Sequence, residues 1–597
     1  MTNHLPPFPD AGKGSEKREN GIAGDIDKTA LWAGAATHEW ANASKAILRT
    51  DMTQGSPVAA LSSVLRKGHW KVVPYETVEG WAGKMVWAAS EADAPELAIP
   101  LGVEGWFAIF VGLFVAPECP TLAWLRLDGD PAGVRREARV DPGYGSSEEV
   151  FFKVARLDET SRLHLSPQRR GFIQACGLTH IRLIPLAPAE VERLLADRAD
   201  LSHRTMAATY DGFSSAFYRS PQTAEEWLRD IEIFRHTDFG TLLLHSPGAD
   251  KVIYPSPIGH MKGSGVEVFP RAGDRYFVEA IQSMARQGIN PLKLLIDGAH
   301  EVGMKVHVGI RPAGWSFVEP YPDYWESSFY RQNPQWRCVD RDGTPVTRMS
   351  WAVPEVRKHL IDLLREQVGF GADGAHIVFN RGYPVVLYEL AAVEIFQRTF
   401  GQDPRTIEES DPRITRWRID VVTAFMRELR AMLDEEGTRR KTRLASSIMV
   451  LGNEPDNLQY GVDVRRLIVE GLVDEVYSYM WDFGATNPRY DFAYFREACR
   501  EKGIPFSPAT ASCFMEPYYT LPMVKSFLES GAKGVAIWDA GDENIYHWSV
   551  ISRFGHAEET LWRIQHLKDV TPPRKHYLFH QLGENVGDGR FGPVWGG

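Results

Sequence analysis

The chain has 597 residues, of which 44% are hydrophobic and 24% are charged, and its formal net charge at pH 7 is −11. These values are ordinary for a globular protein with a sizeable core, and the acidic balance argues against a nucleic-acid surface, which needs a basic footprint. We find neither an 18-residue apolar run nor the apolar segment of a secretory signal, so we expect a cytoplasmic protein without membrane contact.

Aromatic and cysteine residues narrow the functional classes further. The chain contains 18 Trp, 20 Tyr and 29 Phe, and although most such rings fill protein cores, their flat apolar faces suit sugar rings. The five cysteines, at positions 119, 176, 338, 499 and 513, are widely spaced and form no Cys-x-x-Cys pair. This pattern predicts neither a disulfide framework nor a zinc knuckle.

The first third of the chain predicts a tail followed by an all-β domain. Residues 1–27 are polar and read as a flexible tail, and residues 28–50 have a polar helical pattern. Short β-type runs separated by turn residues then predict a β-sandwich, so that a helix and a sandwich together occupy residues 28–190. The predicted strands are 71–74, 84–88, 106–115, 122–127, 149–155 and 180–186.

Beyond residue 187, strand-like runs alternate with helical patterns. The predicted strands are 204–210, 240–245, 305–310, 376–379, 445–451, 475–480, 505–512 and 534–538, and helical patterns between them include 356–367, 414–435 and 521–529. Eight such units predict a (β/α)₈ barrel over residues 200–560, with a C-terminal extension over 561–597. In such a barrel the carboxyl ends of the strands carry the chemistry.

Acidic residues at the predicted strand ends are the candidate catalytic groups. Glu454 follows the fifth strand in Asn-Glu-Pro, where an acid can protonate a leaving oxygen, so it is our candidate general acid/base. A glycosidase usually needs a second carboxylate, and Asp482, Glu516 and Asp539 follow the sixth, seventh and eighth strands. All four are also residue types that form turns, helix caps and loop ion pairs, and the sequence alone does not choose the partner.

Basic, amide and aromatic residues occupy the same strand ends. Two guanidinium groups facing one cleft would hold an acidic sugar, orient the catalytic carboxylates or neutralise a buried acid. The predicted substrate-binding residues are His245, Arg311, Trp315, Asn380, Arg381, Tyr479 and Trp538. The chain has no His-Glu-x-x-His, nucleophile elbow, Walker loop or dinucleotide fingerprint, so we expect neither a catalytic metal nor a cofactor.

Four stretches resemble the glycoside hydrolase-like family 10 barrels. They are Ala299–His307, Gly371–Arg381, Phe400–Pro404 and Trp417–Leu429. The resemblance covers roughly residues 205–545 and implies a barrel hydrolase that acts on glycans, fronted by an accessory β-sandwich. Members of this family tend to carry an Asp in the fourth strand, within Leu-Asp-Phe-x-Arg. Here that place is Val378 while Arg381 is kept, which moves the expected chemistry to Glu454 and the later strands.

These observations predict a glycoside hydrolase that cleaves an oligo- or polysaccharide by paired-carboxylate catalysis. Two other functions fit the same residues. A lyase acting on uronic-acid glycans would use Tyr or His as its base and Arg381 to neutralise the substrate carboxylate. A non-catalytic carbohydrate-binding barrel would account for Val378 in place of the acid. All three take a carbohydrate partner, and the sequence leaves open whether chains assemble into a homo-oligomer.

Overall fold

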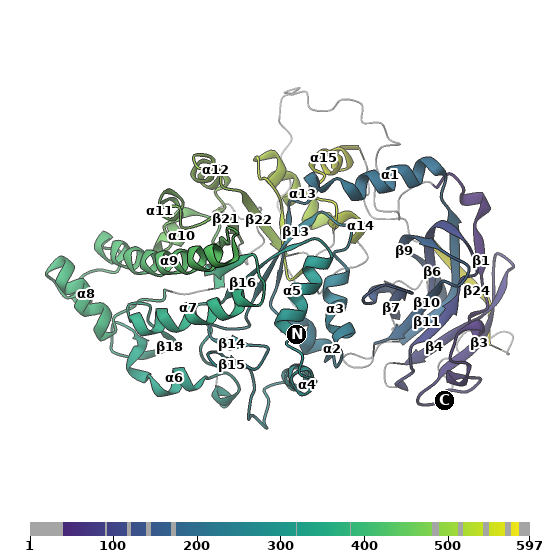
Figure 1. Cartoon of the computed structure of the whole chain (residues 1–597), viewed down its shortest axis with the longest axis horizontal. Helices are drawn as coiled ribbons and strands as arrows, with labels where there is room; N and C mark the ends of the chain where they lie inside the picture. Colours follow the sequence, from purple (N-terminus) through teal and green to yellow (C-terminus); the bar gives the residue numbers. More distant parts are fainter. Residues whose placement is uncertain are drawn as a thin grey trace, which may run out of the picture.

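A β-domain and an α/β barrel lie side by side in the computed structural model (Figure 1). The β-domain comprises residues 40–185 and 575–582, and the barrel with its helices fills the sequence between them. Among the described residues, no helix is both long enough and apolar enough to cross a membrane. The structure describes residues 40–89, 92–115, 121–138, 145–168, 175–317, 319–381, 384–479, 489–511, 517–540, 548–566 and 575–583.

Eight parallel strands close the barrel, and they confirm all eight predicted strands. They are β12 (Met206–Tyr210), β13 (Phe239–His245), β16 (Lys305–Ile310), β19 (Gly374–Val378), β20 (Ala445–Val450), β21 (Glu475–Ser478), β22 (Phe506–Ala511) and β23 (Ala536–Trp538). β12 pairs with both β13 and β23, which completes the ring. These strands are apolar along most of their length because one face packs inside the barrel and the other against helices.

Helices cover the outside of the barrel, and the three helical patterns named from the sequence lie within α7, α9 and α13. The longest helix, α9, begins where Asp411 accepts a hydrogen bond from the backbone N–H of Arg413 and Pro412 occupies the first turn. The helices are α2 (Ser214–Arg219), α3 (Ala224–Glu232), α4 (Ala272–Arg286), α5 (Pro291–Glu301), α6 (Ser328–Gln332), α7 (Pro354–Gly369), α8 (Leu390–Phe400), α9 (Pro412–Arg440), α10 (Glu454–Gln459), α11 (Val464–Val469), α12 (Phe492–Arg500), α13 (Pro517–Glu529), α14 (Trp548–Ile551) and α15 (Ala557–His566).

Alternate residues of each barrel strand point inward, as the two-residue period of a strand requires. One buried cluster inside the barrel contains Ala207, Leu243, Val378, Met449, Tyr477, Tyr479, Ala509, Ala536 and Trp538. Val378 therefore points into the barrel. The Asp expected at this position would have pointed into the same cluster. His245 follows Leu243 by two residues, and Asn380 follows Val378 by two residues. Both therefore lie at the carboxyl ends of the strands, at the mouth of the barrel.

The predicted all-β domain is confirmed, although its strands form one continuous sheet. The pairings β3–β4–β11–β6–β9–β24–β3 close a ring, and β7, β10 and β5 extend the sheet beyond it. The strands are β1 (Ile47–Arg49), β2 (Leu61–Ser62), β3 (Trp70–Thr77), β4 (Ala82–Ala89), β5 (Leu97–Pro100), β6 (Gly105–Val115), β7 (Thr121–Leu127), β8 (Val134–Ala138), β9 (Ser146–Leu157), β10 (Arg162–Pro167), β11 (Ala175–Pro185) and β24 (Lys575–Leu582).

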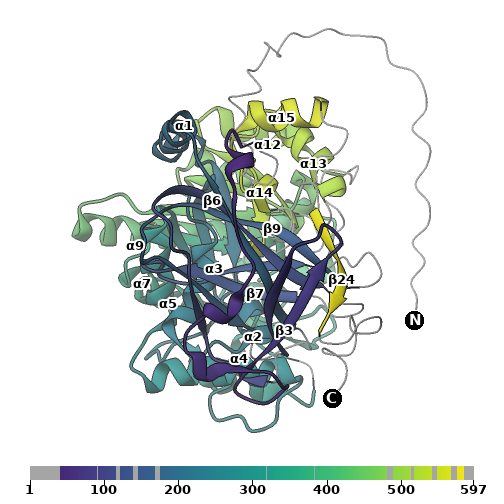
Figure 2. The same ribbon diagram turned by 90° about the vertical axis from the view of Figure 1, so that its right-hand side faces the viewer.

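The two ends of the chain depart from the predicted domain borders. The predicted extension over 561–597 contains the end of α15 and the strand β24, which pairs with β3 and β9 of the β-domain (Figure 2). The helix predicted over 28–50 is absent from its described part, residues 40–50, which form a 3₁₀ turn (Ala43–Lys45) and β1. Pairing of β1 with β11 overrides the weak helical pattern there.

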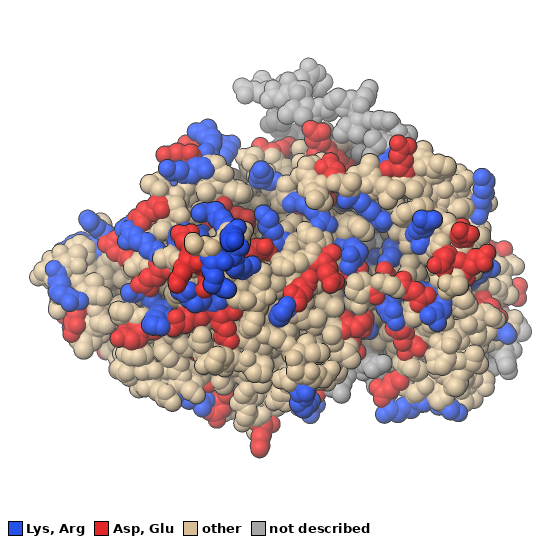
Figure 3. Space-filling view, viewed as in Figure 1, with Lys and Arg blue, Asp and Glu red and all other residues tan. Residues whose placement is uncertain are grey.

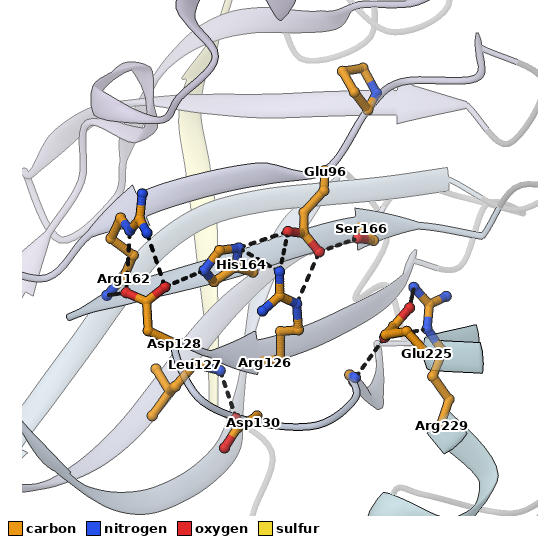
Figure 4. Close-up of polar contacts among 12 residues, drawn as sticks. Glu96, Arg126, Leu127, Asp128, Asp130, Arg162, His164, Ser166, Glu225 and Arg229 are labelled. Atoms are coloured by element: carbon orange, nitrogen blue, oxygen red, sulfur yellow. Dashed lines mark hydrogen bonds and ion pairs between the residues drawn. The ribbon is translucent and has the colours of Figure 1, made fainter. Parts of the chain in front are cut away.

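Polar contacts join the β-domain to the barrel. On α3, Glu225 accepts a hydrogen bond of 2.9 Å from the backbone N–H of Gly133 and pairs with Arg229 (Figure 4). The connecting helix α1 (Pro188–Ala199) carries Asp197, whose carboxylate lies 2.9 Å from the guanidinium of Arg553, between α14 and α15. The barrel is thus fastened to the β-domain and its linker at separate points.

A polar network stiffens the β-domain next to this junction. His164 on β10 lies between two carboxylates, with Nδ1 2.7 Å from Glu96 and Nε2 2.7 Å from Asp128 (Figure 4). Arg126 on β7 also pairs with Glu96. These contacts link the ends of β5 and β7 to β10, so these strands are held by side chains as well as by the backbone.

Candidate active site

Asp211 stands at the mouth of the barrel, directly after β12. The backbone N–H groups of Phe213 and Ser214 donate hydrogen bonds of 2.9 and 2.8 Å to its Oδ1. The guanidinium of Arg311, which directly follows β16, lies 3.2 Å from its Oδ2. Burial alone would raise the pKa of Asp211, but Arg311, His245 and the two backbone N–H groups outweigh it and lower the pKa to about 2. Asp211 is therefore a carboxylate at neutral pH.

His245 ends β13 and faces the same cavity wall as Asp211. The ring is 1% exposed, and neither nitrogen has a hydrogen-bond partner among the described residues. Burial and the neighbouring Arg311 hold the pKa of His245 well below its ordinary value, although Asp211 opposes them. The ring is thus neutral at pH 7, with one nitrogen able to donate and the other able to accept a hydrogen bond.

An aromatic pair and a guanidinium form another wall of the mouth. The rings of Tyr479 and Trp538 stack with centroids 5.1 Å apart and planes 5° from parallel. The guanidinium of Arg381 lies 5.8 Å from the Trp538 ring. Burial and Arg311 lower the pKa of Arg381 to about 10, whereas Asp539 opposes the shift, so Arg381 stays charged at neutral pH.

Asn380 is the most conspicuous polar side chain at the mouth. It lies in the 3₁₀ turn Phe379–Arg381 that follows β19 and is 5% exposed. Neither its Oδ1 nor its Nδ2 has a hydrogen-bond partner among the described residues. A buried polar group left without a partner costs about 1–3 kcal/mol, so a water or ligand hydroxyl would remove a penalty at this position.

Asp539 is the second carboxylate at the mouth and follows β23, the strand that pairs with β12. Its backbone has φ +50°, a conformation that residues other than glycine rarely adopt and that is concentrated at functional sites. The backbone N–H of Asp539 donates a hydrogen bond of 2.8 Å to Oγ1 of Thr209 on β12. Asp211 and Asp539 therefore end two adjacent strands.

The structure brings together His245, Arg311, Asn380, Arg381, Tyr479, Trp538 and Asp539 from the residues predicted for the site. Trp315 lies apart from them: it is fully buried, its Nε1 donates to the carbonyl of Pro312, and its ring packs against Phe329 and Tyr330. It therefore offers no ring face to a sugar. Asp482 and Glu516 lie outside the described residues.

Glu454 occupies the first turn of α10, where Asn453 caps the helix by accepting a hydrogen bond from the backbone N–H of Asp456. Its side chain is 39% exposed, and its Oε1 lies 3.7 Å from Nε of Arg465 on α11. Among the described residues, this ion pair turns the carboxylate towards the outer helices, and no contact joins it to Asp211 or Asp539.

Asp211 is the functional candidate that sequence reasoning missed. Its signal was an acid directly after the first predicted strand. The following Gly212 makes an Asp-Gly pair, which also forms turns, and the structure has this glycine at φ +61°. Alternate residues of β12, Ala207 and Thr209, point into the barrel. Asp211 is next in this alternation, so its side chain lies at the mouth.

Residues 224–507, from α3 into β22, match the family model described as glycosyl hydrolase-like 10. This segment is therefore similar to the glycosyl hydrolase-like 10 family. It includes His245, Arg311, Asn380, Arg381 and Tyr479, whereas Asp211, Trp538 and Asp539 lie outside it.

No curated protein matches the chain in sequence. Among solved structures, a cycloisomaltooligosaccharide glucanotransferase from Paenibacillus sp. is similar, with 12% sequence identity and a TM-score of 0.32. The alignment covers 76% of this chain and 54% of the glucanotransferase chain. The catalytic domain of β-amylase from Paenibacillus polymyxa has 10% identity, a TM-score of 0.38 and coverage of 60% and 99%. An α-galactosidase from Thermus thermophilus has 12% identity, a TM-score of 0.31 and coverage of 82% and 94%. The chain thus spans about half the length of the glucanotransferase.

Proposed function

We propose that this protein is a glycoside hydrolase in which Asp211 and Asp539 are the paired carboxylates. The observation that carries the proposal is their position at the ends of the adjacent strands β12 and β23, with Arg311 and Arg381 beside them. Glycosidic bonds are cleaved by two carboxyl groups that flank the scissile bond. The match of residues 224–507 to the glycosyl hydrolase-like 10 family model supports a carbohydrate-active enzyme.

We give different roles to the two acids, starting from the ionised state of Asp211. Arg311 keeps Asp211 ionised, which suits the group that attacks the anomeric carbon, activates water or stabilises positive charge on the sugar ring. Asp539 is then the group that protonates the leaving oxygen. We choose Asp539 over Glu454 for this role because Glu454 pairs with Arg465 in the outer helical layer.

The remaining mouth residues provide a sugar subsite. The stacked and buried Tyr479–Trp538 pair gives the wall beside the acids a rigid apolar backing. Neutral His245 and Asn380 offer donors and acceptors to sugar hydroxyls, since neither side chain has a hydrogen-bond partner among the described residues. Arg381 adds a charged donor over Trp538.

The test is hydrolysis of a panel of oligosaccharides by the full chain and three variants. We expect Asp211→Asn and Asp539→Asn each to lower kcat by roughly 10²–10⁴-fold, while Glu454→Gln keeps near-full activity. Glu454→Gln is the matched control, because it makes the same kind of change at an exposed carboxyl group. Full turnover by Asp211→Asn, or loss of turnover confined to Glu454→Gln, would overturn the assignment.

A lyase acting on uronic-acid glycans is the second candidate. It is favoured by two guanidinium groups, Arg311 and Arg381, beside the neutral imidazole of His245. The imidazole would take the proton next to the uronate carboxylate while a guanidinium neutralises that carboxylate. An unsaturated product that absorbs ultraviolet light would identify this reaction. Saturable binding without any product would instead identify a non-catalytic carbohydrate-binding barrel.

A further inference from the structure

A second cavity lies at the junction of the β-domain and the barrel and shares no lining residue with the mouth cavity. Its volume is about 180 Å³. From the β-domain come Trp124 on β7 and Gln168 after β10, and from the barrel come the end of α2, the link to α3 and the first turns of α3. A pocket built by two domains is a common location for a ligand.

One wall of this junction cavity contains the buried Trp124, whose ring is in contact with two guanidinium groups. Arg219 and Arg229 lie 5.2 and 4.9 Å from the Trp124 ring. The indole Nε1 of Trp124 donates a hydrogen bond of 2.9 Å to Oε1 of Gln168. Arg229 is further fixed by Glu225, which also bonds the backbone of the β-domain (Figure 4). The wall is therefore held in place before any ligand arrives.

Donors and acceptors remain available on the lining side chains. Glu225 engages Nε and Nη2 of Arg229, and Nη1 has no partner among the described residues. Gln222 uses its Nε2 to reach Ser220, which leaves its Oε1 as an acceptor without a partner in the described part of the chain. Glu226 accepts from the backbone N–H of Gln222 through Oε2, and its Oε1 is a further acceptor.

Charge decides which ligand class fits. The guanidinium groups of Arg219 and Arg229 are paired with Asp230 and Glu225. Glu226 adds another carboxylate to the lining, as does Asp93, which pairs with Lys67 at 3.1 Å. The four carboxylates thus exceed the three cationic groups by one, so an anionic ligand is disfavoured. The mixed donors and acceptors of the lining match a neutral ligand whose hydroxyls both donate and accept.

The backbone of the cavity rim is strained at two positions. Ser220 and Asp93 both have φ +49°, in the left-handed region that costs residues other than glycine about 1–3 kcal/mol and that recurs at ligand clamps. Ser220 lies between the last turn of α2 and Gln222, and its hydroxyl donates to the carbonyl of Tyr276 on α4. The strained turn thus holds the link between α2 and α3 against a neighbouring helix.

We propose that the junction cavity is a second carbohydrate-binding site that takes neutral sugar units. The choice of a sugar rests on the proposed function at the barrel mouth, whereas the cavity and its polar lining do not. Such a site would hold a remote part of a glycan on the same chain as the reacting part, and the second contact would then be intramolecular, which raises the overall affinity.

Isothermal titration calorimetry, which measures sugar binding to the full chain, tests the proposal. The probes are maltotriose, cellotriose and triacetylchitotriose, with trigalacturonate as the anionic comparison, and all proteins carry Asp211→Asn to prevent turnover. Gln222→Trp fills the cavity, and Gln222→Leu removes the acceptor with little change of volume. Gln287→Leu is the matched control, because Gln287 does not line the cavity and its side chain donates to the backbone carbonyl of Gln222.

We expect at least one neutral trisaccharide to bind at two sites, and Gln222→Trp to abolish one of them. Gln222→Leu should weaken that site about tenfold, while Gln287→Leu leaves it unchanged. Asn380→Leu should remove the other site only. The proposal is overturned if Gln222→Trp leaves every isotherm unchanged, which includes the case in which no neutral probe binds. It is also overturned if trigalacturonate binds best at the junction. Full turnover by Asp211→Asn would instead refute the mouth assignment and leave this result standing.

Discussion

The hydroxyl of Thr209 accepts a 2.8 Å hydrogen bond from the backbone N–H of Asp539. This bond joins the last strand of the barrel to the first at the level of the mouth, and it fixes a backbone that has φ +50°. The position of one proposed catalytic acid thus depends on a side chain from the strand that leads to the other acid.

Replacing Thr209 with valine tests this dependence. The Val side chain has nearly the same shape but offers no acceptor, so the strained turn at Asp539 loses its anchor. We expect kcat to fall about tenfold with KM little changed, corresponding to a displacement costing ~1.4 kcal/mol. Thr209→Ser keeps the hydroxyl and should retain most of the activity. Equal kcat for the valine and serine variants would contradict the anchoring role.

Arg311 controls the acidic side of the pH profile. Because it is the strongest of the groups that lower the pKa of Asp211 to about 2, its removal should raise that pKa. We expect the acid limb of kcat/KM for Arg311→Met to move to higher pH by at least ~1 unit relative to the wild type. A pH–rate series between pH 3 and 8 measures the shift, and superimposable acid limbs would refute it.

His556 contributes stability that depends on pH. Burial alone would lower its pKa, but hydrogen bonds to Asp197 and Asp238 outweigh it and raise the pKa to about 9. A folded-state pKa above the unfolded value of about 6.5 means that the stabilisation is complete below pH 6.5 and disappears as the pH rises through 9. His556→Gln should therefore lower Tm at pH 6 by a few degrees and by much less at pH 10.

Thermal unfolding of both proteins across this pH range checks the difference. His203, whose ring stacks on His556 at 3.8 Å, supplies the control. His203→Gln removes the ring contact but leaves the bonds of His556 to Asp197 and Asp238 intact. We expect its effect on Tm to vary much less with pH. An equal loss for His556→Gln at pH 6 and pH 10 would exclude the charged state as the source.

Lys262 is buried without a hydrogen-bond partner for its Nζ among the described residues. Its ammonium site lies 3.6 Å from the Phe213 ring and 3.9 Å from the Trp325 ring. Burial, its largest influence, holds the pKa of Lys262 well below its ordinary value, so the folded chain gains stability as the pH rises towards the unfolded value.

Methionine at position 262 should remove this pH dependence. Lys262→Met has a similar length and needs no proton loss on folding, so we expect Tm at pH 7 to rise by ~2 °C or more. The gap between the variant and the wild type should narrow as the pH approaches 10. A variant that is less stable at pH 7 would show instead that the contacts between the amine and the rings contribute net stability.

The sequence predicts the barrel well because its strands are buried on both faces. Each therefore appears as an apolar run that ends abruptly in polar residues, as at Phe379-Asn380-Arg381. The same ending identified His245, Arg311 and Trp538 as mouth residues. Which way a side chain points just after a strand is decided by loop contacts, and this is why the sequence indicates Glu454 and does not single out Asp211.

Glu454 shows the limit in physical terms. Asn-Glu-Pro is a good helix start as well as a possible catalytic loop, and the sequence does not reveal that Arg465, eleven positions later, pairs with the carboxylate. Asp211 is fixed by its own turn and by Arg311, one hundred positions away. Such distant partners leave no local signal.

The strand β24 has a consequence for how the molecule is made. Since β24 completes the ring of the β-domain between β3 and β9, the barrel is an insertion within that domain, and two chain connections cross the junction. The ring of strands gains its last member only after the ribosome has synthesised the whole barrel. No single cut can yield both domains intact, so separating them would require a circularly permuted gene or a linker from β11 to β24.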